Sequence, residues 1–416
     1  MTYQKNIIMI LLLFQIVQAV PIIVSGGPEN DYESWIIRMR DNRLMVIFDR
    51  NPDWVSGDLY VTFSTDNGDT WDSVIPIIED ILDQATLSFL QLPSDTIRLW
   101  YASNETDEYH IYSAYSMDGI SWTKEGQINL GWGEWDRYYD PTVITEPDSS
   151  LTMSYRGPGG AYIAHMPCGG NWDTLKTLVG PSGFRPRVMK HTNGTYLYAY
   201  HRNMGGGSYE ILIRTSVDRI NWTSELQLTF NNNSHDPFPN ETPDSAYLVY
   251  YATYLPPAYN LYRRRSYDAI NWEDEEQITS DLTNNTQPHF FVDSNEIYLI
   301  WSHAVNLNNH DVYFERSLYT SVAETNTDFY RNKAVIMEIY PNPCRNNTNL
   351  IIASEQIEGF KISLYDALGQ QISEPHNTIF SCATFRIDTS MLPSGIYFLK
   401  IECENDRILK KFTVLH

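Results

Sequence analysis

The sequence predicts an all-β protein: a six-bladed β-propeller followed by a small C-terminal β-sandwich. Three observations lead to this prediction. A short motif ending in tryptophan recurs through most of the chain at intervals of about 50 residues. An x-Pro step followed by an apolar strand recurs at the same interval. Beyond residue 337 short alternating apolar runs, separated by Gly, Pro and Asn turns, replace the repeat.

Composition narrows the class of protein. The chain has 416 residues, 13% aromatic residues and a formal net charge of −23. It is long enough to bury a large core, and its composition is unlike that of disordered or coiled-coil chains. The acidic balance argues against nucleic acid as a partner, because phosphate binding needs clustered Lys and Arg. No Cys and His spacing indicates a metal site, and no cofactor is expected.

The first 19 residues predict a secretory signal peptide. Lys5 supplies a positive charge, Ile7–Phe14 is apolar, and Val17-Gln18-Ala19 has the small-x-small pattern of a cleavage site. The apolar run is shorter than the ~20 residues that span a membrane. We therefore expect cleavage after Ala19, and no membrane span in the mature chain.

The tryptophan motif has four clear copies, and a degenerate copy fills the one double interval. Ser317 marks a sixth unit. Each unit has room for about four short strands, so the sequence predicts six blades over residues 20–327. The sixth unit lacks an outer strand, and Pro21–Val24 is expected to supply it and close the ring. The clear copies are Ser64–Trp71, Ser116–Trp122, Ser216–Trp222 and Ser266–Trp272, and the degenerate copy is His165–Trp172.

The first copy reads Ser-Thr-Asp-Asn-Gly-Asp-Thr-Trp and resembles the Asp box of sialidase-like (BNR-repeat) propellers. An Asp at this position can accept hydrogen bonds from the backbone of a tight turn, and the Trp can pack between strands. Structural roles are therefore expected for Asp66, Asp118, Asp218 and Asp268. Cys168, in the degenerate copy, is expected to be a small buried side chain.

In a propeller, the starts of the inner strands and the ends of the second strands open on one face. The strand starts are Glu33, Asp140, Arg185, Asp236 and Gln287. The second-strand ends are Asp49, Arg50, Arg156, His201, Arg202 and His303. Aromatic residues near the same rim are Trp54, Trp132, Trp135, Tyr138, Tyr139, Tyr254 and Tyr259. Carboxylates, arginines and aromatic rings that converge in this way predict a carbohydrate site.

Two carboxylates are the candidate catalytic pair. Asp140 and Asp236 each precede a proline at a strand start, two blades apart; the alternative is that Asp before Pro only caps a turn. Arg156, Arg185 and Arg202 are candidates for binding a uronic or sialic acid carboxylate, or else they balance charge within an acidic mouth. The other candidate substrate-binding residues are His201, His303, Glu33 and Tyr139.

The chain departs from the sialidase pattern in its arginines. The family opens its first blade with Arg-Ile-Pro, whereas the first unit here has Glu33-Ser34. The best local match is Phe184–Arg187, which lacks the Ile. The family's acidic residue between the second and third strands is echoed by Asp53 or Asp58, and no Tyr–Glu nucleophile pair can be assigned. The resemblance thus implies the fold and leaves hydrolysis open.

The C-terminal region carries a second resemblance. Tyr340-Pro-Asn-Pro343, Tyr365-Asp-Ala-Leu-Gly369, Leu392-Pro-Ser-Gly-Ile-Tyr-Phe398 and Lys410-Lys-Phe412 resemble the type A C-terminal sorting domain of the type IX secretion system. The resemblance implies that residues 337–416 are an export label, preceded by a linker over 328–336. It also implies the type IX secretion machinery as a partner, and a location outside the cell or on its surface.

Three hypotheses for function follow. The propeller recognises an extracellular glycan or glycoprotein, with hydrolysis as a glycoside hydrolase one expected activity. Alternatively it is a non-catalytic adhesion or binding module, or a structural envelope protein. Two carboxyl groups roughly 5–9.5 Å apart in a pocket would favour an enzyme. A flat aromatic rim without such a pair would favour a binding module.

Overall fold

The computed structural model describes residues 21–52, 56–80, 82–231, 233–306, 309–319, 335–340, 347–366, 370–372, 376–403 and 406–414. Strands, turns and bends account for these ranges, which contain no helix and hence none that could cross a membrane. Contacts divide the chain into two compact units, Met1–Ser321 and Val322–His416. The predicted signal peptide and most of the predicted linker lie outside the described residues.

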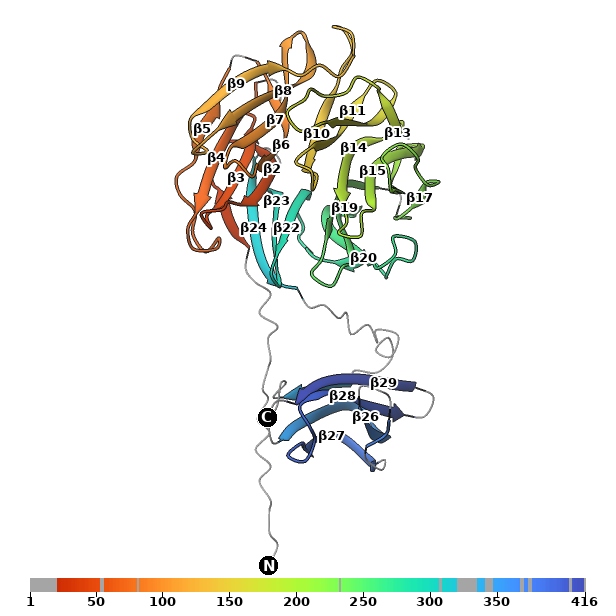
Figure 1. The fold of residues 1–416 in the computed structure, drawn as a ribbon. Coiled ribbons are helices and arrows are strands. Elements are labelled where there is room, and N and C mark those ends of the chain that lie inside the picture. Colours follow the sequence, from red (N-terminus) through yellow and green to blue (C-terminus); the bar gives the residue numbers. More distant parts are fainter. Residues whose placement is uncertain are drawn as a thin grey trace, which may run out of the picture. The chain divides into compact units, whose positions relative to one another are not determined.

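The described strands of the first unit form six four-stranded antiparallel sheets (Figure 1). Each sheet corresponds to one predicted repeat unit, so the all-β propeller fold is confirmed. In order the strands are β1 (Ile22–Ser25); β2 (Asp31–Arg38), β3 (Leu44–Arg50), β4 (Asp58–Ser64), β5 (Ile75–Ile78); β6 (Gln84–Gln91), β7 (Ile97–Thr106), β8 (Glu108–Ser116), β9 (Trp122–Gln127); β10 (Tyr139–Thr145), β11 (Leu151–Gly157), β12 (Gly160–Met166), β13 (Thr177–Pro181); β14 (Phe184–Lys190), β15 (Tyr196–Gly205), β16 (Ser208–Ser216), β17 (Leu226–Gln227); β18 (Ser234–Glu241), β19 (Tyr247–Leu255), β20 (Ala258–Ser266), β21 (Glu276–Gln277); β22 (Asn285–Asp293), β23 (Glu296–Asn306) and β24 (Asn309–Leu318).

The sheets are arranged in a closed ring. Contacts run between the inner strands from β2 to β6, β10, β14, β18 and β22, and from β22 back to β2. β1 pairs with β24, with Ile22 opposite Phe314, so the sixth sheet has the order β1-β24-β23-β22. In Figure 1 the red N-terminal strands accordingly adjoin the cyan β22–β24. The expected contribution of the N-terminal segment to the sixth unit is confirmed.

Apolar clusters hold neighbouring sheets together. Val24, Phe48 and Phe314 belong to one cluster between the first and sixth sheets. Trp35 and Phe290 belong to a larger cluster that also includes side chains of the second and fifth sheets. Burial of this apolar surface is the main favourable contribution to folding, and it fixes the positions of the inner strands around the axis.

The Asp-box residues form the turns between third and fourth strands. Asp118 Oδ1 accepts hydrogen bonds from the backbone N–H of Ser121 at 2.7 Å and of Ile120 at 2.8 Å. These bonds favour the ionised form and lower the pKa of Asp118 to about 2. Asp66, Asp218 and Asp268 accept equivalent bonds from their own turns. Cys168 is exposed in the turn of the degenerate copy, so its predicted burial is wrong.

The second unit is described by five strands: β25 (Val335–Tyr340), β26 (Asn347–Asp366), β27 (His376–Asp388), β28 (Gly395–Cys403) and β29 (Asp406–Val414). They form one connected antiparallel sheet, with the order β25-β26-β28-β29 and β27 also paired to β26. A register shift between Ala353 and Glu358 divides β26. Its first half pairs with β25 and its second half with β28, so one strand serves both halves of the sheet.

Candidate functional site

The inner strand of each of the six propeller sheets carries a β-bulge that contains a non-glycine residue with positive φ. The extra residue of a bulge redirects a side chain, and the left-handed conformation costs roughly 1–3 kcal/mol per residue. Four of these residues precede a proline. Proline has no backbone N–H to donate to a neighbouring strand, and a bulge or a sheet edge is a place where that N–H is not needed. The six residues, here called the central cluster, are Glu33, Thr86, Asp140, Arg185, Asp236 and Gln287.

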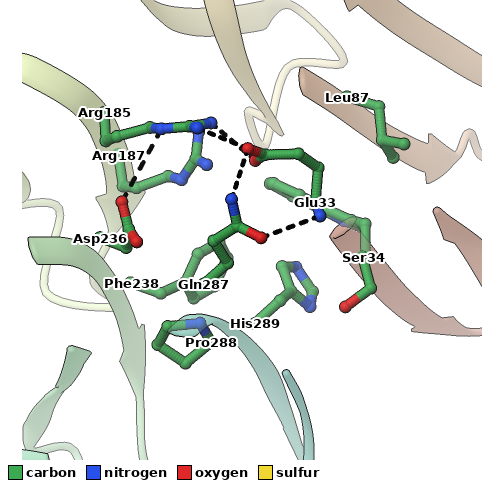
Figure 2. Close-up of a pocket in the computed structure, with 11 residues that line it drawn as sticks. Glu33, Ser34, Leu87, Arg185, Arg187, Asp236, Phe238, Gln287, Pro288 and His289 are labelled. Carbon is green, nitrogen blue, oxygen red and sulfur yellow. Dashed lines mark hydrogen bonds and ion pairs between the residues drawn. The ribbon is translucent and has the colours of Figure 1, made fainter. Parts of the chain in front are cut away.

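Arg185 joins three carboxylates of the central cluster. Figure 2 shows two of them, those of Glu33 and Asp236. Its Nη2 lies 2.5 Å from Glu33 Oε1, and its Nη1 lies 3.0 Å from Asp140 Oδ1. Its Nε lies 3.7 Å from Asp236 Oδ1. Gln287 Nε2 donates to Glu33 Oε1 at 2.7 Å, and Thr86 Oγ1 accepts from the Asp140 N–H at 3.2 Å. Contacts therefore connect the cluster across the axis.

Two of the carboxyl groups that contact the Arg185 guanidinium, those of Glu33 and Asp236, have pKa values shifted in opposite directions. Burial raises the pKa of Glu33 more than Arg185 lowers it, and Asp140 and Asp236 raise it further. Burial has the largest effect on Asp236 and raises its pKa, but Arg185, His201, His235 and Arg187 together outweigh burial, so the pKa lies below its ordinary value. Three carboxyls face the two guanidiniums of Arg185 and Arg187, so keeping one proton balances the charge.

The space within the cluster is small. The free volume is about 20 Å³, which holds one water molecule and is too small for a sugar ring. Glu33 and Asp236 line this space, whereas Asp140 is only 2% exposed and does not. The structure thus brings the predicted pair Asp140 and Asp236 together on Arg185, but places Glu33 in the more accessible position opposite Asp236. The lining residues are Glu33, Ser34, Trp35, Leu87, Arg185, Arg187, Asp236, Phe238, Gln287, Pro288 and His289.

The three candidate arginines differ in their partners. Arg185 is bound to the cluster carboxylates, and Arg202 Nη1 lies 2.8 Å from Glu225 Oε1. Arg156 makes no ion pair within the described residues; its guanidinium lies 4.4 Å from the centre of the Phe184 ring. Only Arg156 of the three therefore keeps its charge available to a ligand.

Aromatic and histidine rings, in several separate groups, flank the cluster and are here called the collar. Tyr32, Tyr139, Phe184 and His235 each directly precede a cluster residue. The ring of His201 stacks on Phe184 at 5.8 Å and contacts His235 at 4.8 Å. The members of the collar are Tyr32, His310, Tyr313, His303, Tyr254, Tyr259, His235, Tyr209, His201, Phe184 and Tyr139. Tyr138 is buried in the core, so its predicted place at the rim is wrong.

The candidate histidines have structural partners in the collar. Burial lowers the pKa of His201 to about 3, so it is neutral at pH 7, and its Nδ1 accepts from the Asp236 N–H at 3.2 Å. Burial also lowers the pKa of His303, whose Nδ1 lies 2.8 Å from Asn285 Oδ1. The ring of His303 stacks on Tyr313 at 4.3 Å. Burial thus favours the neutral form of both rings, and both have hydrogen-bond and ring partners within the protein.

A second carboxyl pair lies between the first two sheets. Asp49 is the last but one residue of β3, and Asp83 directly precedes β6. A Cβ placed on Gly57 would lie 2.4 Å from Asp49 Oδ1 and 2.8 Å from Asp83 Oδ1. Asp83 Oδ1 accepts from the Gly57 N–H at 2.6 Å and from Asn51 Nδ2 at 3.1 Å. Asp49 Oδ1 is buried without a hydrogen-bond partner. Burial, with Asp83 adding to it, raises the pKa of Asp49 well above its ordinary value.

Asp49 was expected at the mouth from its place in the repeat, but its pairing with Asp83 could not be predicted, because no motif joins the two residues. Asp53 lies outside the described residues, and Asp58 opens β4, where its carboxylate accepts from the Asp80 N–H at 3.0 Å. The described residues include no group of three or more His, Cys, Asp or Glu side chains placed to hold a metal ion.

We expect Asp49→Asn to stabilise the protein increasingly as pH rises from about 4 toward neutral. The folded-state pKa of Asp49 is raised, so its contribution to stability is full below the unfolded pKa of about 3.9 and is lost as pH rises through the folded value. Asn does not ionise, so the variant avoids this loss of stability as pH rises. Urea unfolding between pH 4 and 8 measures the difference. Asp83→Asn is the control, and we expect it to lower the free energy of unfolding at every pH in this range. If the free energies of unfolding of the wild type and Asp49→Asn depend on pH in the same way, the raised pKa of Asp49 is contradicted.

Comparison with known proteins supports both parts of the fold. Residues 338–415 match the family described as "Secretion system C-terminal sorting domain". The chain thus carries such a domain, which confirms the C-terminal resemblance at the level of the sorting domain. No curated protein matches the chain.

Solved structures that resemble the chain are propellers at low sequence identity. A protein of unknown function from Dyadobacter fermentans has a TM-score of 0.60 and 14% identity, over 72% of this chain and 98% of that one. An α-L-arabinanase from Penicillium chrysogenum, solved with arabinobiose, has a TM-score of 0.56 and 16% identity, over 73% and 98%. The Hadza microbial sialidase Hz136 has a TM-score of 0.55 and 14% identity, over 70% and 66%. The first unit is therefore a sialidase-like β-propeller in fold.

Proposed function

We propose that the mouth of the propeller binds an extracellular glycan. The collar of rings around the central cluster carries this proposal, because rings stack on sugar faces and a few convergent polar groups orient a ligand. Glu33, Asp236 and Gln287 offer hydrogen-bonding groups beneath the collar. The cluster leaves room for one water, so the sugar would rest above it. The similar propellers solved as a sialidase and as an arabinanase with arabinobiose support the same class of ligand.

Hydrolysis of that glycan is the second candidate function. The observation that favours it is the opposite pKa shift of two carboxyls on one guanidinium. In glycosidases, different pKa values of two neighbouring carboxyl groups allow one to act as the acid while the other stays ionised. Glu33, whose raised pKa favours the protonated form, would protonate the leaving oxygen, and Asp236, whose lowered pKa favours the ionised form, would act as base or nucleophile.

A panel of neutral, uronic acid and sialic acid aryl glycosides tests both functions. If the full-length protein turns one over, Glu33→Gln and Asp236→Asn are each expected to lower kcat/KM about 10²- to 10⁴-fold. Glu241→Gln is the matched control, because Glu241 lies on β18 with Asp236 but at the far end of the strand. Turnover that survives Glu33→Gln would remove Glu33 as the acid. If the protein binds a glycan but turns over none of the glycosides, the non-catalytic binding module remains as its function.

We further propose that the type IX secretion machinery exports the protein to the cell surface or beyond. The C-terminal sorting domain supports this proposal, as does the signal-like pattern of residues 1–19. N-terminal sequencing of exported protein tests the predicted cleavage after Ala19. A mature chain that begins at Met1 would contradict it.

A further inference from the structure

A groove of about 330 Å³ lies over the third sheet, beside the central cluster. This volume falls within the usual range of ligand sites, about 300–1,000 Å³. Tyr139 lines the groove and directly precedes Asp140 of the central cluster, and it pairs with Arg156 across β10 and β11. The groove and the cluster therefore adjoin on one strand. The lining residues are Trp135, Asp136, Arg137, Tyr139, Arg156, Gly157 and Pro158.

Trp135 gives the groove an open aromatic surface. Trp135 is 72% exposed, although a large aromatic residue is usually mostly buried. Large apolar groups that stay exposed often form part of a binding surface. The nearby Trp132 differs: its ring packs edge-on against Tyr162, and the Lys176 ammonium lies 4.5 Å from its centre. The free indole face of Trp135 is suited to stacking on a sugar ring.

Arg156 gives the groove a positive charge that the described carboxylates leave unpaired. Its Nη1 donates to the Gly157 carbonyl oxygen at 2.7 Å, and Phe184 supports the guanidinium plane. Its Nε is buried without a hydrogen-bond partner. Arg137, in the same groove, forms an ion pair with Glu108. The guanidinium of Arg156 is therefore held in place while some of its N–H donors have no partner, an arrangement that suits binding of a carboxylate.

We propose that this groove binds a uronic acid unit of an acidic oligosaccharide, with its ring face on Trp135 and its C6 carboxylate on Arg156. The inference rests on the proposed glycan binding at the mouth and names the class of glycan. A C6 carboxylate projects from the edge of the ring, so one sugar can meet the indole and the guanidinium together. The adjoining sugar of the chain would then lie over the central cluster.

The test compares the affinity of the full-length protein for trigalacturonic and glucuronate-containing trisaccharides with that for their carboxyl-reduced counterparts. The wild type is expected to bind an acidic form about 10- to 100-fold more tightly, as for a charge-assisted contact. Arg156→Gln should abolish this preference and leave binding of the reduced form unchanged, and Arg156→Lys should restore part of it. Trp135→Ala should weaken both forms about tenfold. Arg43→Gln is the control, because Arg43 forms a surface ion pair with Asp41 and does not line the groove, and it should change neither affinity.

Each contrary outcome is distinct. Equal affinity for acidic and reduced forms, or a preference that survives Arg156→Gln, would overturn the groove assignment and leave glycan binding at the mouth intact. Sialyllactose binding that depends on Arg156 would overturn the choice of a uronic acid. If no saccharide of either kind binds, both this inference and the proposed function fail.

Discussion

Replacing Arg185 with Ala is expected to lower the free energy of unfolding by about 3–5 kcal/mol, because removing one partner of a buried ion pair leaves uncompensated charge. Here the remaining charges are the carboxylates of Glu33, Asp140 and Asp236. Without the guanidinium the folded-state pKa of Asp236 loses its largest lowering contribution and rises, and that of Glu33, already raised, rises further. The deficit relative to wild type should therefore be small near pH 4 and grow toward pH 7.

Tryptophan fluorescence during urea unfolding measures this effect in the intact chain. All 11 tryptophans precede residue 302, so the signal reports on the propeller and not on the sorting domain. Arg43→Ala is the control: its ion pair with Asp41 lies on the surface, and its loss should cost less than about 1 kcal/mol. An effect of Arg185→Ala no larger than that of Arg43→Ala, or one independent of pH, would show that Arg185 does not neutralise the cluster.

Gly68→Ala is expected to destabilise the propeller by about 2–4 kcal/mol, from backbone strain and overpacking. Gly68 lies in the first Asp-box turn with a φ of +90°, and a Cβ there would lie 2.2 Å from a carbon of the buried Phe314 ring. Gly194 has the same φ of +90° but no atom within 4 Å of its added Cβ. Gly194→Ala should therefore report the strain alone, about 1–2 kcal/mol.

The same urea titration separates the two contributions. The difference between the variants is the cost of pressing a methyl group against Phe314, which joins the first sheet to the sixth. Equal midpoints for Gly68→Ala and Gly194→Ala would show that Phe314 can move aside. That result would contradict close packing between the first and last sheets.

Much of the architecture could be predicted because the fold repeats. The Asp-box spacing predicted the repeat length, and the x-Pro steps predicted where four inner strands start. The structure shows that each of these steps lies in a β-bulge, where proline is tolerated because its missing N–H is not needed for strand pairing. Glu33 followed from its place in the repeat. Thr86 was missed, because it precedes Leu87 and carries neither proline nor charge.

The interactions within the site were less predictable, because partners come from different sheets. Nothing local to Arg185 indicates that it binds Glu33, 152 positions away, or that Arg202 has a partner in Glu225 while Arg156 has none among the described carboxylates. Asp49 and Asp83 likewise meet only because the end of β3 lies beside the start of β6. Side-chain pairing of this kind depends on ring geometry, and periodicity in one strand carries no information about it.

The pairing of β1 with β24 has a consequence for the order of folding. Ser25 Oγ accepts a hydrogen bond from the N–H of Val312, 287 positions along the chain. Contacts of such high sequence separation are entropically costly to form early and are typical of slow-folding domains. We expect the five sheets built from consecutive strands to form first and the sixth to form last. The mouth, which takes Glu33 from β2 and Gln287 from β22, would then be complete only after this slowest step.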